Sequence, residues 1–401
     1  MDYNIIIVSL SICIVLSYLF NEIAKRTNVP SVLMLIVAGV IVGQLLNFFP
    51  QYNVDFFPHL KVLGTIGLIM IVLEGALDLE LTKEKRGLIG KATLLAVLGI
   101  LGSILFIAPI FHYLLDMDAG LSLLYATPLA VISSAIVIPS VVSLNDYDKE
   151  LLIYESCISD IIGIMIFNLK LSIMQTQEIG GSITDFGIEF LVTILVSFII
   201  GIGLVLLFKF LNAKVKLFFF ISILILIYAF GKMMHLSPLV LILMFGLILK
   251  NHSLFFIGPL KNLMTRMEFK KMEKDFHIIS RETAFVLRTF FFIVFGLTID
   301  LLSLVNFEVL VISLMVFIGI NLVRIMLLKV FAKQGTQILE YVAPRGLITI
   351  LLFYSIPEDL ISNSFQPGVI LWVIILTSIY MTFGLIKYSK EPEDIEGQED
   401  L

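Results

Sequence analysis

The sequence predicts an all-α protein that crosses a membrane many times, with about 13 transmembrane helices of roughly 20 residues each. Of its 401 residues, 59% are hydrophobic and only 15% are charged, whereas a soluble protein carries about 25% charged residues. Apolar runs of helix length also follow one another along the chain with short connections. These observations exclude a soluble enzyme, a nucleic-acid-binding protein and a large aqueous domain.

The apolar runs are the predicted membrane-spanning helices. They occupy residues 4–20, 29–47, 61–79, 92–115, 121–144, 151–175, 184–210, 217–234, 237–250, 281–299, 305–331, 340–356 and 367–388. The run at 237–250 is the shortest. A hydrocarbon core about 30 Å thick needs about 20 helical residues to cross it, so most of these runs are long enough to span it.

The positions of the basic residues predict how the chain is oriented. When the N-terminus is placed outside and the sides alternate, most of the 27 lysines and arginines fall in inner loops. Only Lys61 and Lys232 fall in outer loops. Inner loops of membrane proteins carry an excess of Lys and Arg, so we expect an outer N-terminus, an inner C-terminus and an odd number of spans.

One connection, at residues 251–280, is much longer than the others. It interleaves lysines and arginines with leucine, methionine and phenylalanine. We expect a basic amphipathic helix that lies on the inner membrane surface. A solvated linker that joins two halves of the protein is the alternative, and both interpretations stay open.

Two predicted helices are interrupted by proline at corresponding positions, seven helices apart. In the run 121–144, Pro139 removes a backbone donor and clashes with the carbonyl of Ala135. In the run 340–356, Pro344 begins a Pro-Arg-Gly sequence. An odd separation reverses direction, so the two halves are expected to form an inverted repeat with two broken, crossing helices. Broken helices at matching positions of inverted halves indicate the binding site of a transporter.

Asp160 is the leading candidate for such a site. It lies about nine residues into the run 151–175, roughly 14 Å from the inner end. An ionisable side chain at that depth costs at least about 2.5 kcal/mol and is functional by default. Ser133 and Ser134 lie at a similar depth in the preceding run, where hydroxyls and freed carbonyls could bind a hard cation. The alternative is that these residues only join and pack the helices.

Two arginines lie deep in predicted helices, and a buried guanidinium demands a carboxylate partner. Arg324 is roughly 13 Å from the inner end of its run, and Glu155 is its candidate partner. Arg288 is the second deep arginine, whereas Glu74 and Arg345 lie nearer the inner edge. The sequence therefore predicts a structural Glu155–Arg324 ion pair. Glu74, Arg288 and Arg345 are predicted to line an inner funnel or gate, or to extend to the interface.

Five short motifs occur in order along the chain, at residues 21–33, 73–79, 155–160, 290–301 and 344–346. The second, third, fourth and fifth resemble the EGGLDL, ESLxND, FFxxxGxxIDL and PRG sequences of the monovalent cation:proton antiporter superfamily. The first resembles the family's first connection. This resemblance to the Na⁺/H⁺ and K⁺/H⁺ exchangers covers nearly the whole chain.

The resemblance implies an inverted-repeat fold in which a core moves against a dimer-forming domain. Dimerisation-domain helices are expected in 1–80 and 214–300, core helices in 88–175 and 305–388, a linker helix in 184–210 and an acidic inner tail in 389–401. The resemblance also implies that Asp160 binds either a proton or the cation and that Ser156 is a cation ligand. Glu155 with Arg324 is implied to be structural.

Two segments depart from the exchanger pattern. Ser133 and Ser134 stand where exchangers often carry Thr-Asp, and they resemble the glutathione-regulated potassium efflux antiporters. Ser159 stands where exchangers carry Asn before the aspartate. The choice between Na⁺ and K⁺ is therefore open. Those potassium efflux relatives also carry a C-terminal nucleotide-binding domain, and we expect none here.

We therefore expect a secondary antiporter that exchanges H⁺ for Na⁺ or K⁺ for pH and cation homeostasis, and not an enzyme. It is expected to be a homodimer in the inner membrane of a bacterium, without a cofactor. With Glu155 paired, only Asp160 is left to alternate between H⁺ and a transiently bound Na⁺ or K⁺, so exchange should be electroneutral. A sodium-coupled symporter of an organic anion is the alternative function.

Overall fold

The computed structural model describes residues 3–27, 29–47, 57–176, 179–210, 217–234, 236, 238–256, 266–299, 305–331 and 337–388. Within these ranges the regular secondary structure is helical, without a β-strand. The predicted tail 389–401, residues 257–265 of the predicted inner segment, and Asp300 of the motif at 290–301 lie outside the described residues.

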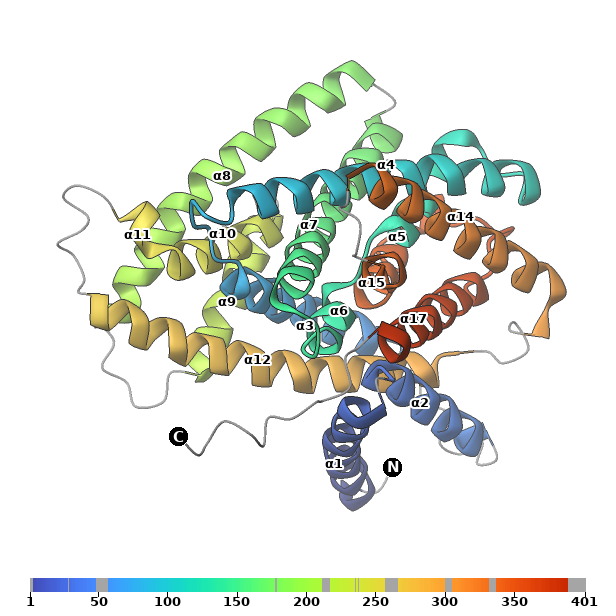
Figure 1. Cartoon of the computed structure of the whole chain (residues 1–401), viewed down its shortest axis with the longest axis horizontal. Coiled ribbons are helices and arrows are strands. Elements are labelled where there is room, and N and C mark those ends of the chain that lie inside the picture. Colours follow the sequence, from blue (N-terminus) through green and yellow to red (C-terminus); the bar gives the residue numbers. More distant parts are fainter. Residues whose placement is uncertain are drawn as a thin grey trace.

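Each predicted apolar run contains a helix or an interrupted pair of helices (Figure 1). Those of the first half are α1 (Tyr3–Thr27), α2 (Ser31–Asn47), α3 (Phe57–Asp78), α4 (Arg86–Leu114), α5 (Ala119–Ala130), α6 (Ser134–Ser140) and α7 (Asp146–Thr176). Those of the second half are α8 (Ile179–Phe210), α9 (Leu217–Met233), α10 (Pro238–Lys250), α11 (His252–Phe255), α12 (Arg266–Leu297), α14 (Phe307–Phe331), α15 (Ile338–Tyr341), α16 (Leu347–Phe353), the 3₁₀ turn η3 (Glu358–Leu360) and α17 (Gly368–Tyr388).

The composition of the helices agrees with a membrane protein. Among the described residues, five helical segments are long and apolar enough to cross a membrane, judged by length and composition, and five shorter helices are also apolar. The all-helical class predicted from the sequence is therefore confirmed. The number of spans and their orientation stay predictions.

The helices pack in two groups. In the first, which we call the scaffold, α12 packs along α2 and α3, and α10 packs against α3, α8 and α9. In the second, which we call the crossing bundle, α4 packs against α5, α7 and α14, and α14 packs against α17. Contacts of α3 with α6, α7 and α16 join the two groups. Figure 1 shows α8, α10 and α11 at the left of the view and α14 and α17 at the right.

The helix α12 differs from the sequence prediction. The inner amphipathic segment was expected to end at residue 280, but α12 continues without interruption from Arg266 to Leu297, through the tenth predicted span. The reason is that no proline, and no glycine before Gly296, interrupts this stretch. Its first half is amphipathic, as predicted, because Phe269, Met272 and Phe276 are buried while the intervening lysines are exposed.

The scaffold is held by a close backbone contact between α2 and α12. A Cβ atom added at Gly39 would lie 2.2 Å from the carbonyl oxygen of Ile293, and one added at Gly296 would lie 2.4 Å from the carbonyl oxygen of Ile36. Both glycines therefore permit the two backbones to touch, which is the usual way that helices associate in a membrane. A larger residue at either position would push α2 away from α12.

Candidate functional site

Two helices are interrupted in the middle of the crossing bundle, and their interruptions meet. The first interruption, residues 131–133, separates α5 from α6, and the second, residues 342–346, separates α15 from α16. The backbone N–H of Ser133 donates to the carbonyl of Pro344 at 2.9 Å. The two extended segments therefore lie against each other where they cross.

The first interruption is not where the sequence placed it. Pro139 was expected to break the helix, but Pro139 lies inside α6, and the extended segment ends six residues earlier at Ser133. The cause is the neighbouring helix α7, because its side chains take the N–H groups that a continuous helix would use. The hydroxyl of Ser159 accepts from the N–H of Ile132 at 3.0 Å, and Asp160 accepts from the N–H of Ser134 at 3.3 Å.

Asp160 is buried at this crossing, with 3% of its surface exposed. Its Oδ2 atom also accepts a hydrogen bond from the hydroxyl of Ser134. Its Oδ1 atom and the hydroxyl of Ser133 are both buried, and neither has a hydrogen-bond partner within the described part of the chain. Oxygen atoms of this kind are the ligands that hard cations prefer. The crossing thus contains a buried carboxylate oxygen and a buried hydroxyl, neither of which has a partner in the described part of the chain.

The other predicted ligands, Ser156 and Ser159, make different contacts. The hydroxyl of Ser156 donates to the carbonyl of Ile153 at 3.1 Å, and Ser156 lies one turn before Asp160 on the same side of α7. The hydroxyl of Ser159 instead supports the interruption at Ile132. The two serines therefore have separate surroundings, although the sequence grouped them.

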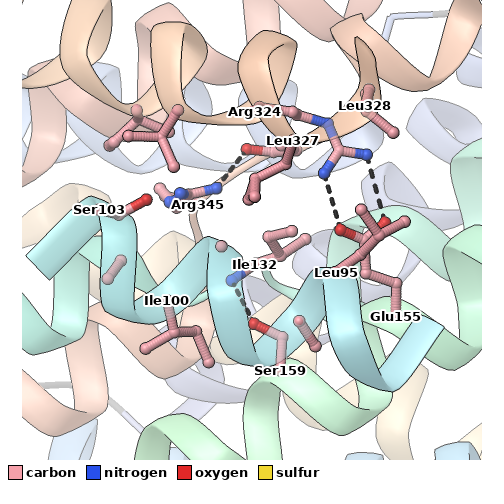
Figure 2. Close-up of a pocket in the computed structure, with 16 residues that line it drawn as sticks. Leu95, Ile100, Ser103, Ile132, Glu155, Ser159, Arg324, Leu327, Leu328 and Arg345 are labelled. Atoms are coloured by element: carbon pink, nitrogen blue, oxygen red, sulfur yellow. Dashed lines mark hydrogen bonds and ion pairs between the residues drawn. The ribbon is translucent and has the colours of Figure 1, made fainter. Parts of the chain in front are cut away.

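Glu155 and Arg324 form the ion pair that the sequence anticipated (Figure 2). Nη1 of Arg324 donates to Oε1 of Glu155 at 2.8 Å, and Nη2 donates to Oε2 at 3.3 Å. Nε donates to the carbonyl of Leu339 on α15 at 2.6 Å. Both side chains are buried, so this bidentate contact joins α7 to α14, and the bond from Nε to Leu339 connects the pair to α15.

Arg345 is buried in the crossing, and its predicted role in an inner funnel or gate stays a prediction. Its Nε atom donates to the carbonyl of Leu129 at 2.7 Å, and Nη1 donates to the carbonyl of Ala343 at 2.6 Å. It lines a cavity of about 20 Å³ together with Glu155, Ser159 and Arg324, large enough for about one water molecule. The guanidinium lies here because it donates to carbonyls that have no helical donor where the helices are interrupted.

Glu74 and Arg288 line a larger cavity of about 800 Å³, with Asp78, Ile136 and Pro139 among its other lining residues. Nη2 of Arg288 lies 3.6 Å from Oε2 of Glu74. Asp78 lies 2.8 Å from Nε2 of His277 on α12. The cavity thus carries charged groups of both signs and reaches the α6 helix.

Two side chains that the sequence did not single out hold the connection between α3 and α4. The Tyr154 hydroxyl donates to the carbonyl of Glu80 at 2.7 Å and accepts from its N–H at 3.0 Å. Asn251 donates to the carbonyl of Leu79 at 2.9 Å and accepts from the N–H of Leu81 at 2.6 Å. Neither residue had a signal in the sequence, because each acts only through backbone groups distant along the chain.

Lys85 completes this connection by bridging two carboxylates. Its ammonium group lies 3.2 Å from Glu80 and 2.9 Å from Glu150. The pKa of Lys85 is raised above its ordinary value, because burial, which lowers it, is outweighed by the hydrogen bonds to Glu150 and Glu80. Lys85 therefore stays charged and ties the connection to the beginning of α7.

Comparison with known families shows to which class of proteins this chain belongs. The family model for the transmembrane part of sodium/hydrogen exchangers matches residues 9–387. The chain belongs to the sodium/hydrogen exchanger family. It is therefore a multi-pass membrane transporter and not an enzyme, and the family predicted from the short motifs is confirmed.

Solved structures show the same fold. A structure at pH 8 of the sodium proton antiporter MjNhaP1 from Methanocaldococcus jannaschii has a TM-score of 0.68 and 20% identity, and the match covers 97% of this chain and 100% of that one. A structure of the same antiporter from an electron microscopy map has a TM-score of 0.68 and 18% identity, covering 97% and 96%. A search of curated proteins found no match.

Proposed function

We propose that the exchanger carries one proton in one direction and one Na⁺ or K⁺ in the other, both at Asp160. One observation supports this most directly. A buried carboxylate has one oxygen without a partner among the described residues, and the equally unpartnered hydroxyl of Ser133 lies at the same crossing. A carboxylate in such a place is stable only when it is neutralised, and either a proton or a monovalent cation neutralises it.

The candidate cation ligands are oxygens of Asp160, Ser133, Ser134 and Ser156. Ser134 already donates its hydroxyl proton to Asp160, so a cation bound there would require that hydroxyl to turn and offer its lone pairs. Ser159 is less suited to bind directly, since its oxygen accepts from Ile132. The cation is in each case a substrate that binds transiently.

Transport would proceed by alternating access, with the crossing bundle moving against the scaffold. The packing groups support this division, because the scaffold contains helices from 1–80 and 214–300 together with α8, the predicted linker helix, and the crossing bundle contains those from 88–175 and 305–388. The family resemblance supports dimerisation through the scaffold. The proposed orientation keeps the N-terminus outside and the 800 Å³ cavity open to the inner side, in the inner membrane of a bacterium.

Exchange would be electroneutral because one negative site alternates between two cargoes of equal charge. Glu155 is matched by Arg324 in a bidentate pair, so Asp160 alone is free to change its cargo at the crossing. A second exchangeable carboxylate would move one extra charge, worth about 2.3 kcal/mol per 100 mV. Without it, the transport equilibrium depends only on the two concentration gradients.

Purified protein in liposomes with an internal pH indicator tests the function. Addition of Na⁺, Li⁺ or K⁺ to acid-loaded vesicles should produce alkalinisation that depends on the cation, and the ranking of the three gives the selectivity. A diffusion potential set by a permeant anion such as thiocyanate, imposed in K⁺-free Na⁺ medium at matched pH and Na⁺ gradients, should cause no steady pH change. A steady change driven by voltage alone, and absent from protein-free vesicles, would refute one-for-one exchange.

A further inference from the structure

Arg288 forms a hydrogen bond between the scaffold and the crossing bundle next to the candidate ion site. It lies on α12 and is largely buried. Its Nη1 atom donates to the carbonyl of Ala135 on α6 at 2.5 Å, while Nη2 faces Glu74 on α3 at 3.6 Å. One scaffold side chain therefore bridges a scaffold carboxylate and a backbone group of the other packing group.

Pro139 explains why the carbonyl of Ala135 is available. In an α-helix this carbonyl would accept from the N–H of the residue four positions later, and that residue is Pro139. Proline has no N–H, so a buried acceptor inside α6 loses its helical donor. The guanidinium of Arg288 supplies the missing donor from another helix.

The bonded carbonyl is adjacent to the residue that contacts Asp160. Ser134 precedes Ala135 in α6, and both its N–H and its hydroxyl donate to Oδ2 of Asp160. The seven residues of α6 are thus held on one side by α7 and on another by Arg288. A shift of α6 away from Arg288 would move Ser134 relative to the carboxylate.

We propose that Arg288 is a positioning residue for the ion site, which acts through the carbonyl that Pro139 leaves free. It holds α6 so that Ser134 stays on Asp160, and this bond must be released when the crossing bundle moves against the scaffold. The inference rests on the proposed transport at Asp160. In this proposal Pro139 leaves the carbonyl of Ala135 free to accept from Arg288, and it does not break the helix.

If Arg288 acted only through its charge, the opposite change in the apparent affinity for Na⁺ would be expected. A positive charge beside a cation path repels the cation, so its neutralisation would tighten cation binding. Loss of a positioning contact would weaken binding, because Ser134 would no longer be held in place. The direction of the change in apparent Na⁺ affinity therefore separates the two roles.

The experiment is a double-mutant cycle measured as Na⁺-dependent exchange in liposomes. Arg288→Gln should weaken the apparent affinity for Na⁺ about tenfold in the otherwise unchanged protein, equivalent to about 1.4 kcal/mol. In the Pro139→Ala background the new N–H of residue 139 can bond Ala135, so Arg288→Gln should cost less than about threefold. Arg281→Gln is the matched control, since Arg281 lines the same cavity on α12, and it should change the affinity less than about twofold.

Equal losses in both backgrounds, or a tighter affinity for Na⁺ in Arg288→Gln, would overturn the proposal. If Arg288→Gln does not yield folded protein, Arg288→Lys takes its place, with a smaller loss expected in wild type and none in Pro139→Ala. Asp160→Asn is measured alongside. Exchange retained by Asp160→Asn would reject the transport site itself, whereas its loss together with unaltered Arg288 variants would reject only the positioning role.

Discussion

The two interrupted helices have a similar backbone plan but opposite chemistry. At residues 131–133, freed N–H groups are bound by the hydroxyl of Ser159 and the carboxylate of Asp160. At residues 342–346, Thr377 accepts from the N–H of Arg345, and the guanidinium of Arg345 donates to the carbonyl of Leu129 at the end of α5 and to that of Ala343. Each interruption thus has a hydroxyl that accepts a backbone N–H, and the two differ in their charged group, which is a carboxylate at the first and a guanidinium at the second.

Under the proposed function, this difference assigns ion binding to the first interruption and a structural role to the second. A carboxylate can take up a proton or a cation, and Oδ1 of Asp160 has no partner among the described residues. A guanidinium is always charged and has donors only, and Arg345 uses its donors on Leu129 and Ala343. We infer that the first interruption changes during transport and that the second is fixed.

The largest expected effect comes from removing the charge of Asp160, which lies against the first interruption. Asp160→Asn should abolish exchange, because an amide neither exchanges a proton nor neutralises a cation. The measurement is cation-dependent pH change in liposomes, with thermal unfolding in detergent as the control for folding. Wild-type rates in a folded Asp160→Asn variant would reject the assignment.

The next effect tests the ion pair between α7 and α14. Glu155→Ala leaves the guanidinium of Arg324 buried without its partner and should destabilise the protein by about 3–5 kcal/mol. Thermal unfolding in detergent should show this loss, while the apparent cation affinity of the remaining folded protein changes little. An equally stable variant with lost cation binding would make Glu155 a ligand.

A smaller effect is expected when the guanidinium of Arg345 is replaced by a positively charged group of a different shape. Arg345→Lys retains the positive charge, but one ammonium group lacks the planar fork that reaches both Leu129 and Ala343. One carbonyl is then left without a donor, at a cost of about 1–3 kcal/mol. The variant should unfold at lower temperature but keep the wild-type apparent affinity for Na⁺. A changed affinity at unchanged stability would contradict the fixed role of the second interruption.

The smallest effects come from a matched pair of hydroxyls, one at each interruption. Ser159 accepts from the N–H of Ile132 at 3.0 Å, and Thr377 accepts from the N–H of Arg345 at 3.1 Å. Ser159→Ala and Thr377→Val should each cost about 1 kcal/mol in unfolding free energy. Only Ser159→Ala should also alter the cation affinity, measured by exchange in liposomes, and equal affinity changes in both variants would remove the distinction.

The sequence was sufficient to predict features that follow from the free-energy cost of placing a charge in an apolar helix. A charge in an apolar helix must have a partner or a function, and this argument singles out Glu155, Arg324 and Asp160 from their positions along the chain. Prolines at corresponding positions of the two halves indicated which two helices are interrupted, but not the place of the first interruption, because Pro139 lies inside α6. The family then follows from motifs that overlap these residues.

Features that depend on tertiary partners were beyond the sequence. The first interruption lies at residues 131–133 because Ser159 and Asp160 bind its N–H groups, and no local pattern shows that. The location of Arg345 depends on carbonyls distant in the chain, and so does the bond from Arg288 to Ala135. These contacts become visible only when the helices are assembled.

The connection between α3 and α4 limits how far the two packing groups can separate. Asn251 of the scaffold fixes Leu79 and Leu81, so only the chain between Leu81 and Arg86 is free to extend. Five Cα–Cα steps reach at most about 17 Å. While Asn251 keeps its bonds and α4 keeps its first turn, the inner end of the crossing bundle cannot travel beyond that radius. For the proposed alternating access, the connection would therefore act as a tether that places an upper limit on the movement.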